Sequence, residues 1–115
     1  MKFILFSIIA LALVAPIFAN ACSVSDTSFK IQGTVQSNMV LNSAWKIVGG
    51  ISGNIIHGSS GKIVGSLVGE TIIDSKGVIA GHIVNPNVFN SGYQLVGYGS
   101  DCSDIELAAV KLLAL

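Results

Sequence analysis

Few side chains in this chain have the types and spacing that catalysis or metal binding requires. The candidates are the two histidines, His57 and His82. They do not share a position of the repeat described below, and no pair of His or Cys residues has the spacing of a metal site. The chain also has neither a Gly-x-Ser-x-Gly nucleophile elbow nor a phosphate-binding loop. We therefore expect no catalytic residue, no metal and no cofactor, and a protein that is not an enzyme.

The elements that position the remaining candidates follow a repeat of 16 residues. Its clearest mark is a series of regularly spaced glycines, Gly33, Gly49, Gly65, Gly81 and Gly97. Aliphatic residues precede each glycine by two and nine positions and follow it by two, except that Gly99 breaks the last series. We interpret these five glycines as structural residues at places where strands crowd together or bend sharply.

Each repeat has the pattern of a short β-hairpin. In the fourth copy, Asp74-Ser75-Lys76-Gly77 is typical of a type I turn, because Asp favours its first position and Gly its fourth. Along the second strand, the aliphatic residues two before and two after the glycine share its face, since side chains alternate. We expect that face to be the core.

The two cysteines indicate how the repeats are arranged. Cys22 and Cys102 are 80 residues apart, which is five repeats, so they occupy the same position of the repeat. A disulfide needs Cα atoms within about 7 Å, whereas the ends of an open ten-strand meander lie on the order of 40 Å apart. The sequence therefore predicts an all-β fold, a closed ring or shallow barrel of five hairpins over 22–102, joined by Cys22–Cys102. Unpaired or intermolecular cysteines are the alternative.

Closure would bring together three aromatic residues that share one repeat position, Phe29, Trp45 and Tyr93, where the other copies have Gly61 and Gly77. Exposed aromatic residues between polar turn residues are a usual platform for sugar rings or for a protein partner. The alternative is that the three rings pack over the ends of the hairpins. We take these three residues as the candidate binding site.

The two ends of the chain have their own patterns. Residues 1–21 have a lysine, an apolar run and Ala19-Asn20-Ala21 as a cleavage site, so we interpret them as a secretory signal peptide and expect a secreted protein. The alternative is a surface lipoprotein anchored at Cys22. At the other end, Ser103 and Glu106 form a capping box before an apolar run, which predicts a short helix over 103–115. This helix could plug the ring or mediate assembly.

Charge limits the choice of partner. After residue 21 the chain has five lysines, no arginine and six acidic residues. This part of the chain therefore has no excess of positive charge to neutralise phosphates, so we expect no nucleic-acid partner. Contact with a membrane would need lipidation or the C-terminal helix.

The repeated pattern of an aliphatic pair, an Asp-Ser-x-Gly-like turn and an aliphatic-x-Gly-x-aliphatic strand over residues 24–99 resembles the β-flower domains. The resemblance implies hairpins that radiate from a shallow symmetric barrel, remotely similar to the Tubby C-terminal domain. That domain binds phosphoinositides through a cluster of basic residues, and this chain has no such cluster. We therefore expect a secreted, non-enzymatic binding module, with carbohydrate or a protein as partner. The alternative is a structural protein that oligomerises through its C-terminal helix.

Overall fold

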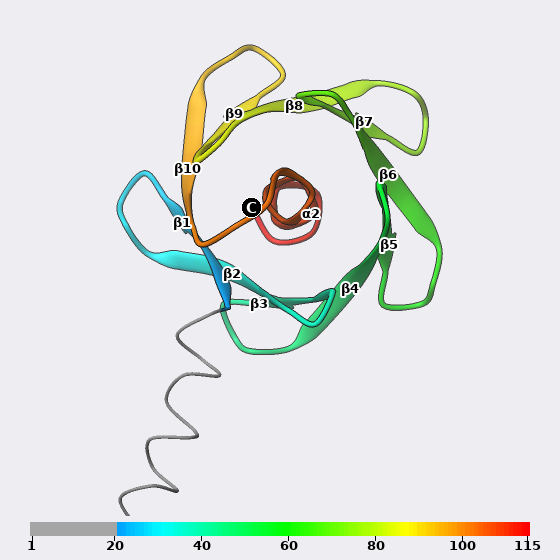
Figure 1. Ribbon diagram of the computed structural model, residues 1–115, viewed down its shortest axis with the longest axis horizontal. Coiled ribbons are helices and arrows are strands. Elements are labelled where there is room, and N and C mark those ends of the chain that lie inside the picture. Colours follow the sequence, from blue (N-terminus) through cyan, green and yellow to red (C-terminus); the bar gives the residue numbers. More distant parts are fainter. Residues whose placement is uncertain (1–20) are drawn as a thin grey trace, which may run out of the picture.

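The computed structural model describes residues 21–115, so the predicted signal peptide lies outside the described residues except for Ala21. Within these residues, ten strands precede one helix (Figure 1). The elements are β1 (Cys22–Asp26), β2 (Ile31–Gln36), β3 (Met39–Asn42), β4 (Ile47–Ser52), β5 (Ile55–Gly58), β6 (Ile63–Val68), β7 (Thr71–Asp74), β8 (Ile79–Val84), β9 (Asn87–Asn90), β10 (Leu95–Ser100) and α2 (Asp104–Leu113).

The ten strands form a closed antiparallel barrel in which each strand pairs with its neighbours in sequence. The pairing of β1 with β10, from Ser23 opposite Ser100 to Asp26 opposite Gly97, closes the sheet. Closure leaves no strand edge free to pair with another chain. The predicted fold class, an all-β closed barrel with a short C-terminal helix, is confirmed.

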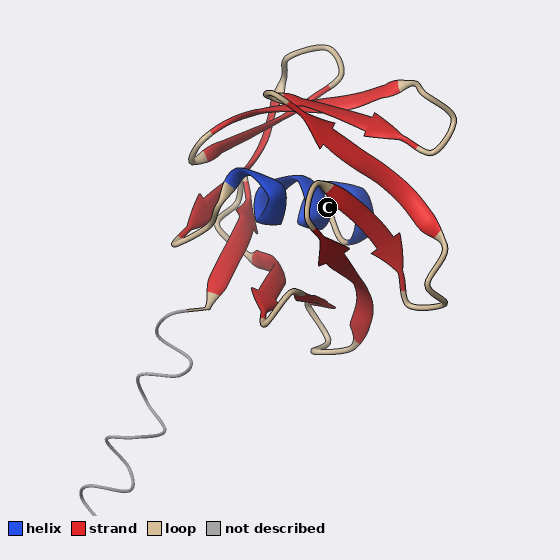
Figure 2. Cartoon of the chain, turned by 45° about the vertical axis from the view of Figure 1, so that its right-hand side comes forward, coloured by secondary structure: helices blue, strands red, loops and turns tan. Residues whose placement is uncertain are grey.

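The connections between strands differ at the two ends of the barrel. At one end are five four-residue connections, which we call the wide loops: 27–30, 43–46, 59–62, 75–78 and 91–94. They project outward from the barrel (Figures 1 and 2). At the other end are four two-residue connections, the tight turns: 37–38, 53–54, 69–70 and 85–86.

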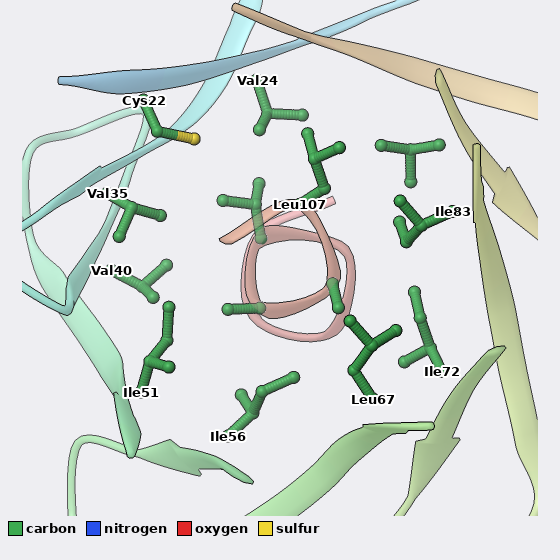
Figure 3. Close-up of a cluster of buried hydrophobic side chains, with 14 residues drawn as sticks. Cys22, Val24, Val35, Val40, Ile51, Ile56, Leu67, Ile72, Ile83 and Leu107 are labelled. Atoms are coloured by element: carbon green, nitrogen blue, oxygen red, sulfur yellow. The ribbon is translucent and has the colours of Figure 1, made fainter. Parts of the chain in front are cut away.

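The hydrophobic core lies inside the barrel and is formed by rings of aliphatic side chains around α2 (Figure 3). One ring is fully buried and consists of Val24, Val40, Ile56, Ile72 and Val88. A second ring consists of Val35, Ile51, Leu67 and Ile83. The helix fills the centre with four residues of zero exposure, Leu107 to Val110. Figure 1 shows α2 end-on inside the barrel, so this helix plugs it.

The predicted core face of the second strand in each repeat is wrong at one position. The isoleucines two residues before the repeated glycines are about half exposed, at 51% for Ile31, 48% for Ile47, 55% for Ile63 and 49% for Ile79. The cause is a register shift in each strand pair that a wide loop joins. Ile73 pairs with Ile79 while Ile72 pairs with Gly81, which leaves Ala80 as an extra residue. Such a bulge interrupts the alternation of faces.

The repeated glycines make room for the helix. A Cβ built on Gly65 would lie 2.5 Å from the carbonyl oxygen of Ile73 and 2.6 Å from Cδ1 of Leu112. Around the barrel, the nearest residues of α2 are Val110 at Gly33, Leu113 at Gly49 and Lys111 at Gly81, and Leu115, beyond the end of the helix, is the nearest at Gly97. We call these five glycines the glycine ring. A side chain at any of them would collide with the barrel backbone or with α2.

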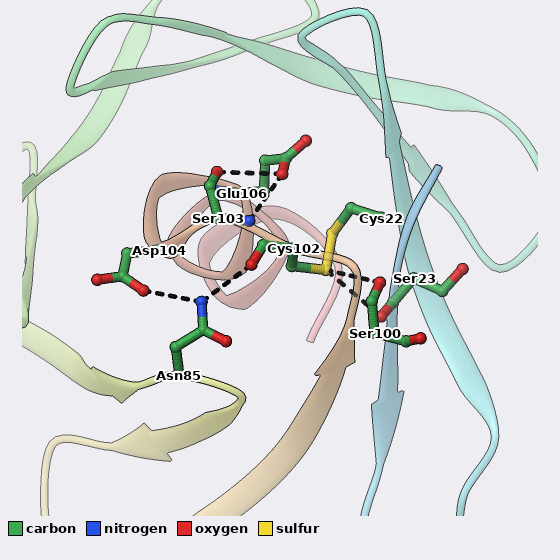
Figure 4. The surroundings of a disulfide bond; sticks show 8 residues. All are labelled: Cys22, Ser23, Asn85, Ser100, Cys102, Ser103, Asp104 and Glu106. Carbon is green, nitrogen blue, oxygen red and sulfur yellow. Dashed lines mark hydrogen bonds between the residues drawn. A yellow bond between two sulfur atoms is a disulfide. The ribbon is translucent and has the colours of Figure 1, made fainter. Parts of the chain in front are cut away.

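The disulfide and the start of α2 lie together at the end of the barrel that has the tight turns (Figure 4). The predicted bond between Cys22 and Cys102 is present, with Cα atoms 4.6 Å apart. The chain then turns inward, and Asn85 Nδ2 donates hydrogen bonds to the Cys102 carbonyl oxygen and to Asp104 Oδ1, both at 2.9 Å. The predicted capping box of Ser103 and Glu106 starts the helix.

Gly99 is the one exception to the aliphatic pattern, and the turn into α2 explains it. A Cβ on Gly99 would collide with Leu107 Cδ2 and would lie 3.3 Å from the Cys102 Sγ. The exception therefore lets the chain enter the barrel beside the disulfide.

Substitution of Gly65 by alanine should destabilise the protein by about 1–3 kcal/mol, because the added methyl group overpacks the contact with Leu112 and Ile73. Gly58→Ala is the control, since its Cβ would be 3.8 Å from the nearest atom, Val64 Cγ1. Urea unfolding of both variants measures the difference. Equal midpoints for Gly65→Ala and the wild type would contradict the role of the glycine ring.

Loss of the disulfide should lower the free energy of unfolding by about 2–4 kcal/mol, because the bond closes a long loop and restricts the unfolded chain. The two cysteines are 80 residues apart. The measurement compares urea unfolding of the wild type with that of a Cys22→Ser, Cys102→Ser variant. The wild type under reducing conditions should match the variant, and an unchanged midpoint in both would contradict this account.

Candidate functional site

The wide loops share one pattern of hydrogen bonds, which fixes the conformation of each loop. In the loop after β7, the Gly77 amide donates to the Asp74 carbonyl oxygen at 3.0 Å, and the Asp74 amide donates to the Val78 carbonyl oxygen at 2.9 Å. The Asp74 carboxylate also accepts from the amides of Lys76 and Val78. Side chains that bond to the backbone two residues on favour such turns. Asp26, Asn42 and Asn90 form the same bonds in their own loops.

Position 58 is the exception among these loops, because Gly58 has no side chain to accept such bonds. Its backbone bonds remain, from the Gly61 amide to the Gly58 carbonyl oxygen and from the Gly58 amide to the Lys62 carbonyl oxygen. The loop after β5 therefore has the same shape with fewer bonds to support it.

The third residue of each wide loop has a left-handed backbone, and we call this residue the loop tip. The φ angle is +87° at Gly61 and +80° at Gly77. It is +63° at Phe29, +63° at Trp45 and +60° at Tyr93. Glycine adopts this conformation readily, whereas it costs other residues roughly 1–2 kcal/mol. Three of the five loop tips thus combine an unfavourable backbone with a large aromatic side chain.

All three candidate binding residues are exposed at the loop tips. The exposed fraction is 76% for Phe29, 64% for Trp45 and 66% for Tyr93. Their loops follow one another around the closed barrel, since β1 pairs with β10. The rings do not stack on one another. Phe29 stacks on Tyr98 with centroids 5.5 Å apart, and Tyr93 stacks on His82 at 3.8 Å.

These stacks place the rings of Phe29 and Tyr93 over the outer wall of the barrel. His82 and Tyr98 belong to one repeat position, which also includes Thr34, Gly50 and Ser66. His82 is only 7% exposed and lies beneath the Tyr93 ring. Of the three candidate residues, Trp45 alone has no stacked ring among the described residues.

The two histidines occupy different surroundings. His82 is the inner member of the stack with Tyr93, whereas His57 on β5 is half-buried and its Nδ1 lies 3.4 Å from the Gly58 carbonyl oxygen. Within residues 21–115, no three residues among His, Cys, Asp and Glu gather in a way that could hold a metal ion.

Hydrogen bonds lower the pKa of the carboxyl group of Asp26, the last residue of β1. The hydrogen bond from the Lys30 amide is the main cause that lowers the pKa of its carboxyl group, and bonds from Gln32 and Ser28 act in the same direction. The Gln32 side-chain amide donates to Asp26 Oδ2 at 2.8 Å. The ionised carboxylate therefore supports the loop that holds Phe29.

Sequence reasoning found the loop tips but missed what they contact. A loop tip and the wall residue beneath it are eleven residues apart, as Tyr93 and His82 are. They belong to different repeat positions and to different strand pairs, so no periodic pattern links them. One signal was available in the sequence. The loop-tip position and the wall position each include an aromatic residue, Tyr93 and Tyr98, and each include a glycine, Gly61 and Gly50.

The fold and this surface define a closed antiparallel barrel with an internal helix and aromatic loop tips. Comparisons of the chain with models of protein families, with curated proteins and with solved structures gave no match. In the part of the chain from residue 21 onward, no helix has both the length and the apolar character to cross a membrane.

Substitution of Gly58 by asparagine should stabilise the protein by about 0.5–1.5 kcal/mol. The new side chain can accept hydrogen bonds from the Ser60 and Lys62 amides, as Asn42 does from Ala44 and Lys46. It also reduces the freedom of the unfolded chain. Thermal unfolding measures the gain.

The matched control for this prediction is Asn90→Gly. It removes the bonds that the Gly92 and Gln94 amides donate and should destabilise by a similar amount. A lower melting temperature for Gly58→Asn would show that this loop differs from the others.

Proposed function

We propose that the protein is a secreted, non-enzymatic binding module that holds a carbohydrate through the aromatic residues of its wide loops. The observation that carries the proposal is the left-handed backbone of Phe29, Trp45 and Tyr93. Glycine occupies the same position in the other two loops, so the fold does not need a side chain there. Strained residues of this kind are typical of functional sites.

Trp45 is the centre of the proposed site. Its side chain is 64% exposed although it is the largest apolar side chain in the protein. Indole rings stack on the apolar faces of sugar rings and leave their N–H free to donate a hydrogen bond. One face of the Phe29 ring stacks on Tyr98, and one face of the Tyr93 ring stacks on His82. Each of these two rings therefore offers its edge and its other face to a ligand.

An extracellular location supports the same proposal. The disulfide is compatible with it, because such bonds persist in oxidising surroundings. Secretion through a signal peptide over residues 1–21 remains part of the proposal. So does the interpretation of 22–102 as one hairpin repeated five times, with its resemblance to the β-flower domains.

Two other functions are less well supported. A lipid anchor on Cys22 would need the sulfur that bonds to Cys102. Assembly through the C-terminal helix would need its apolar residues, but Leu107 to Val110 are fully buried in the barrel.

A glycan array identifies the glycans that the wild type binds. Replacement of Trp45 by glycine should abolish binding to these glycans, because the stacking surface is lost. Stability should change by less than about 1 kcal/mol, since glycine relieves the left-handed backbone while it adds freedom to the unfolded chain. Trp45→Tyr keeps a ring at the loop tip and should retain part of the binding. Wild-type binding by Trp45→Gly would overturn the proposed site.

A further inference from the structure

The seam between the second and third wide loops contains an open slot on the outer wall of the barrel. The cavity has a volume of about 310 Å³. Its walls include Met39, Ile47, Gly50, His57, Ser59 and Gly61. We call it the glycine slot, because Gly50 and Gly61 leave it without two side chains.

The glycine slot corresponds to the seams that stacked rings fill elsewhere in the same barrel. Gly61 is a loop tip and Gly50 is the wall residue eleven positions before it, as His82 is before Tyr93. In that seam the two rings stack at 3.8 Å with planes 7° apart. Phe29 and Tyr98 stack in the same way across the point of closure, with planes 6° apart. The slot is thus a ring-stacking seam from which both rings are missing.

The surroundings of the slot suit a planar aromatic ring. The His57 imidazole lies over the backbone of β4, since a Cβ on Gly50 would be 2.7 Å from His57 Cε1. This imidazole lines the slot beside Gly50. Met39 and Ile47, exposed to 43% and 48%, add apolar walls. A cavity with apolar walls and a few polar groups is the usual form of a small-molecule site.

We propose that the glycine slot binds a small aromatic molecule of the size of indole or a phenol, stacked on His57. Ser59 and Asn38 line the slot and have polar groups that can pair with the polar group of such a ring. The proposal does not depend on the glycan site, because Trp45 does not line the slot.

The test is to titrate the full chain after residue 21 with indole and with 4-methylphenol. Amide chemical shifts in NMR spectra measure the binding. Saturable shifts should centre on the Gly50 and Gly61 amides. Gly61→Tyr should weaken binding at least tenfold, because its ring can fill the seam as Tyr93 does. Gly77→Tyr is the matched control and should bind as the wild type does. Both glycines have the left-handed backbone that Phe29, Trp45 and Tyr93 tolerate.

A second variant guards against misfolding of Gly61→Tyr. His57→Ala should weaken binding at least fivefold while the NMR spectrum of the barrel core stays unchanged. Trp45→Gly should leave the binding of indole unaltered, which separates this site from the proposed glycan site. Absence of saturable shifts, or equal binding by wild type and His57→Ala, would overturn the proposal. So would saturable binding of methyl glucoside or cyclohexanol at the same amides as tightly as indole.

Discussion

The packing of α2 against the glycine ring is the contact on which the rest of the structure depends. A ten-strand barrel needs something to fill its interior, and here the filling is a helix of the same chain. Helix and strands can approach closely only where the barrel wall has no side chains. Val110 and Leu112 of α2 lie against Gly33 and Gly65, and Leu115, beyond the end of the helix, lies against Gly97. Carbonyl oxygens of the barrel crowd Gly49, Gly65, Gly81 and Gly97 as well. The glycines spaced 16 residues apart are therefore the positions where the barrel leaves no room for a Cβ.

Much of this architecture could be predicted because it depends on periodic residues. The glycines and the aliphatic residues that flank them indicated ten short strands, and the shared register of Cys22 and Cys102 indicated that the sheet closes. The C-terminal helix was predicted from Ser103 and Glu106, whose side chains form the capping box. Each of these inferences required only local pattern and the geometry of a disulfide.

The sequence was misleading where backbone geometry overrides alternation. Ile31 and its three counterparts appeared to belong to the core, but the bulge in each strand pair turns them outward. The glycine slot could not be predicted either, because Gly50 and Gly61 become neighbours only through the diagonal packing of a loop tip on the wall. That packing is a property of the closed barrel, and the spacing of eleven residues has no meaning in a single hairpin.

The shared shape of the five wide loops lets one loop serve as the reference for another. A glycine at a left-handed position needs no explanation, so Gly61 and Gly77 define the loop tip in its least strained form. Measured against them, Trp45 has both the unfavourable backbone and an exposed side chain, without the stacked neighbour that Phe29 and Tyr93 have. Phe29 and Tyr93 regain contact through Tyr98 and His82, whereas among the described residues no ring stacks on Trp45. A left-handed backbone combined with an exposed, unstacked indole ring is the reason that Trp45 stands at the centre of the proposed site.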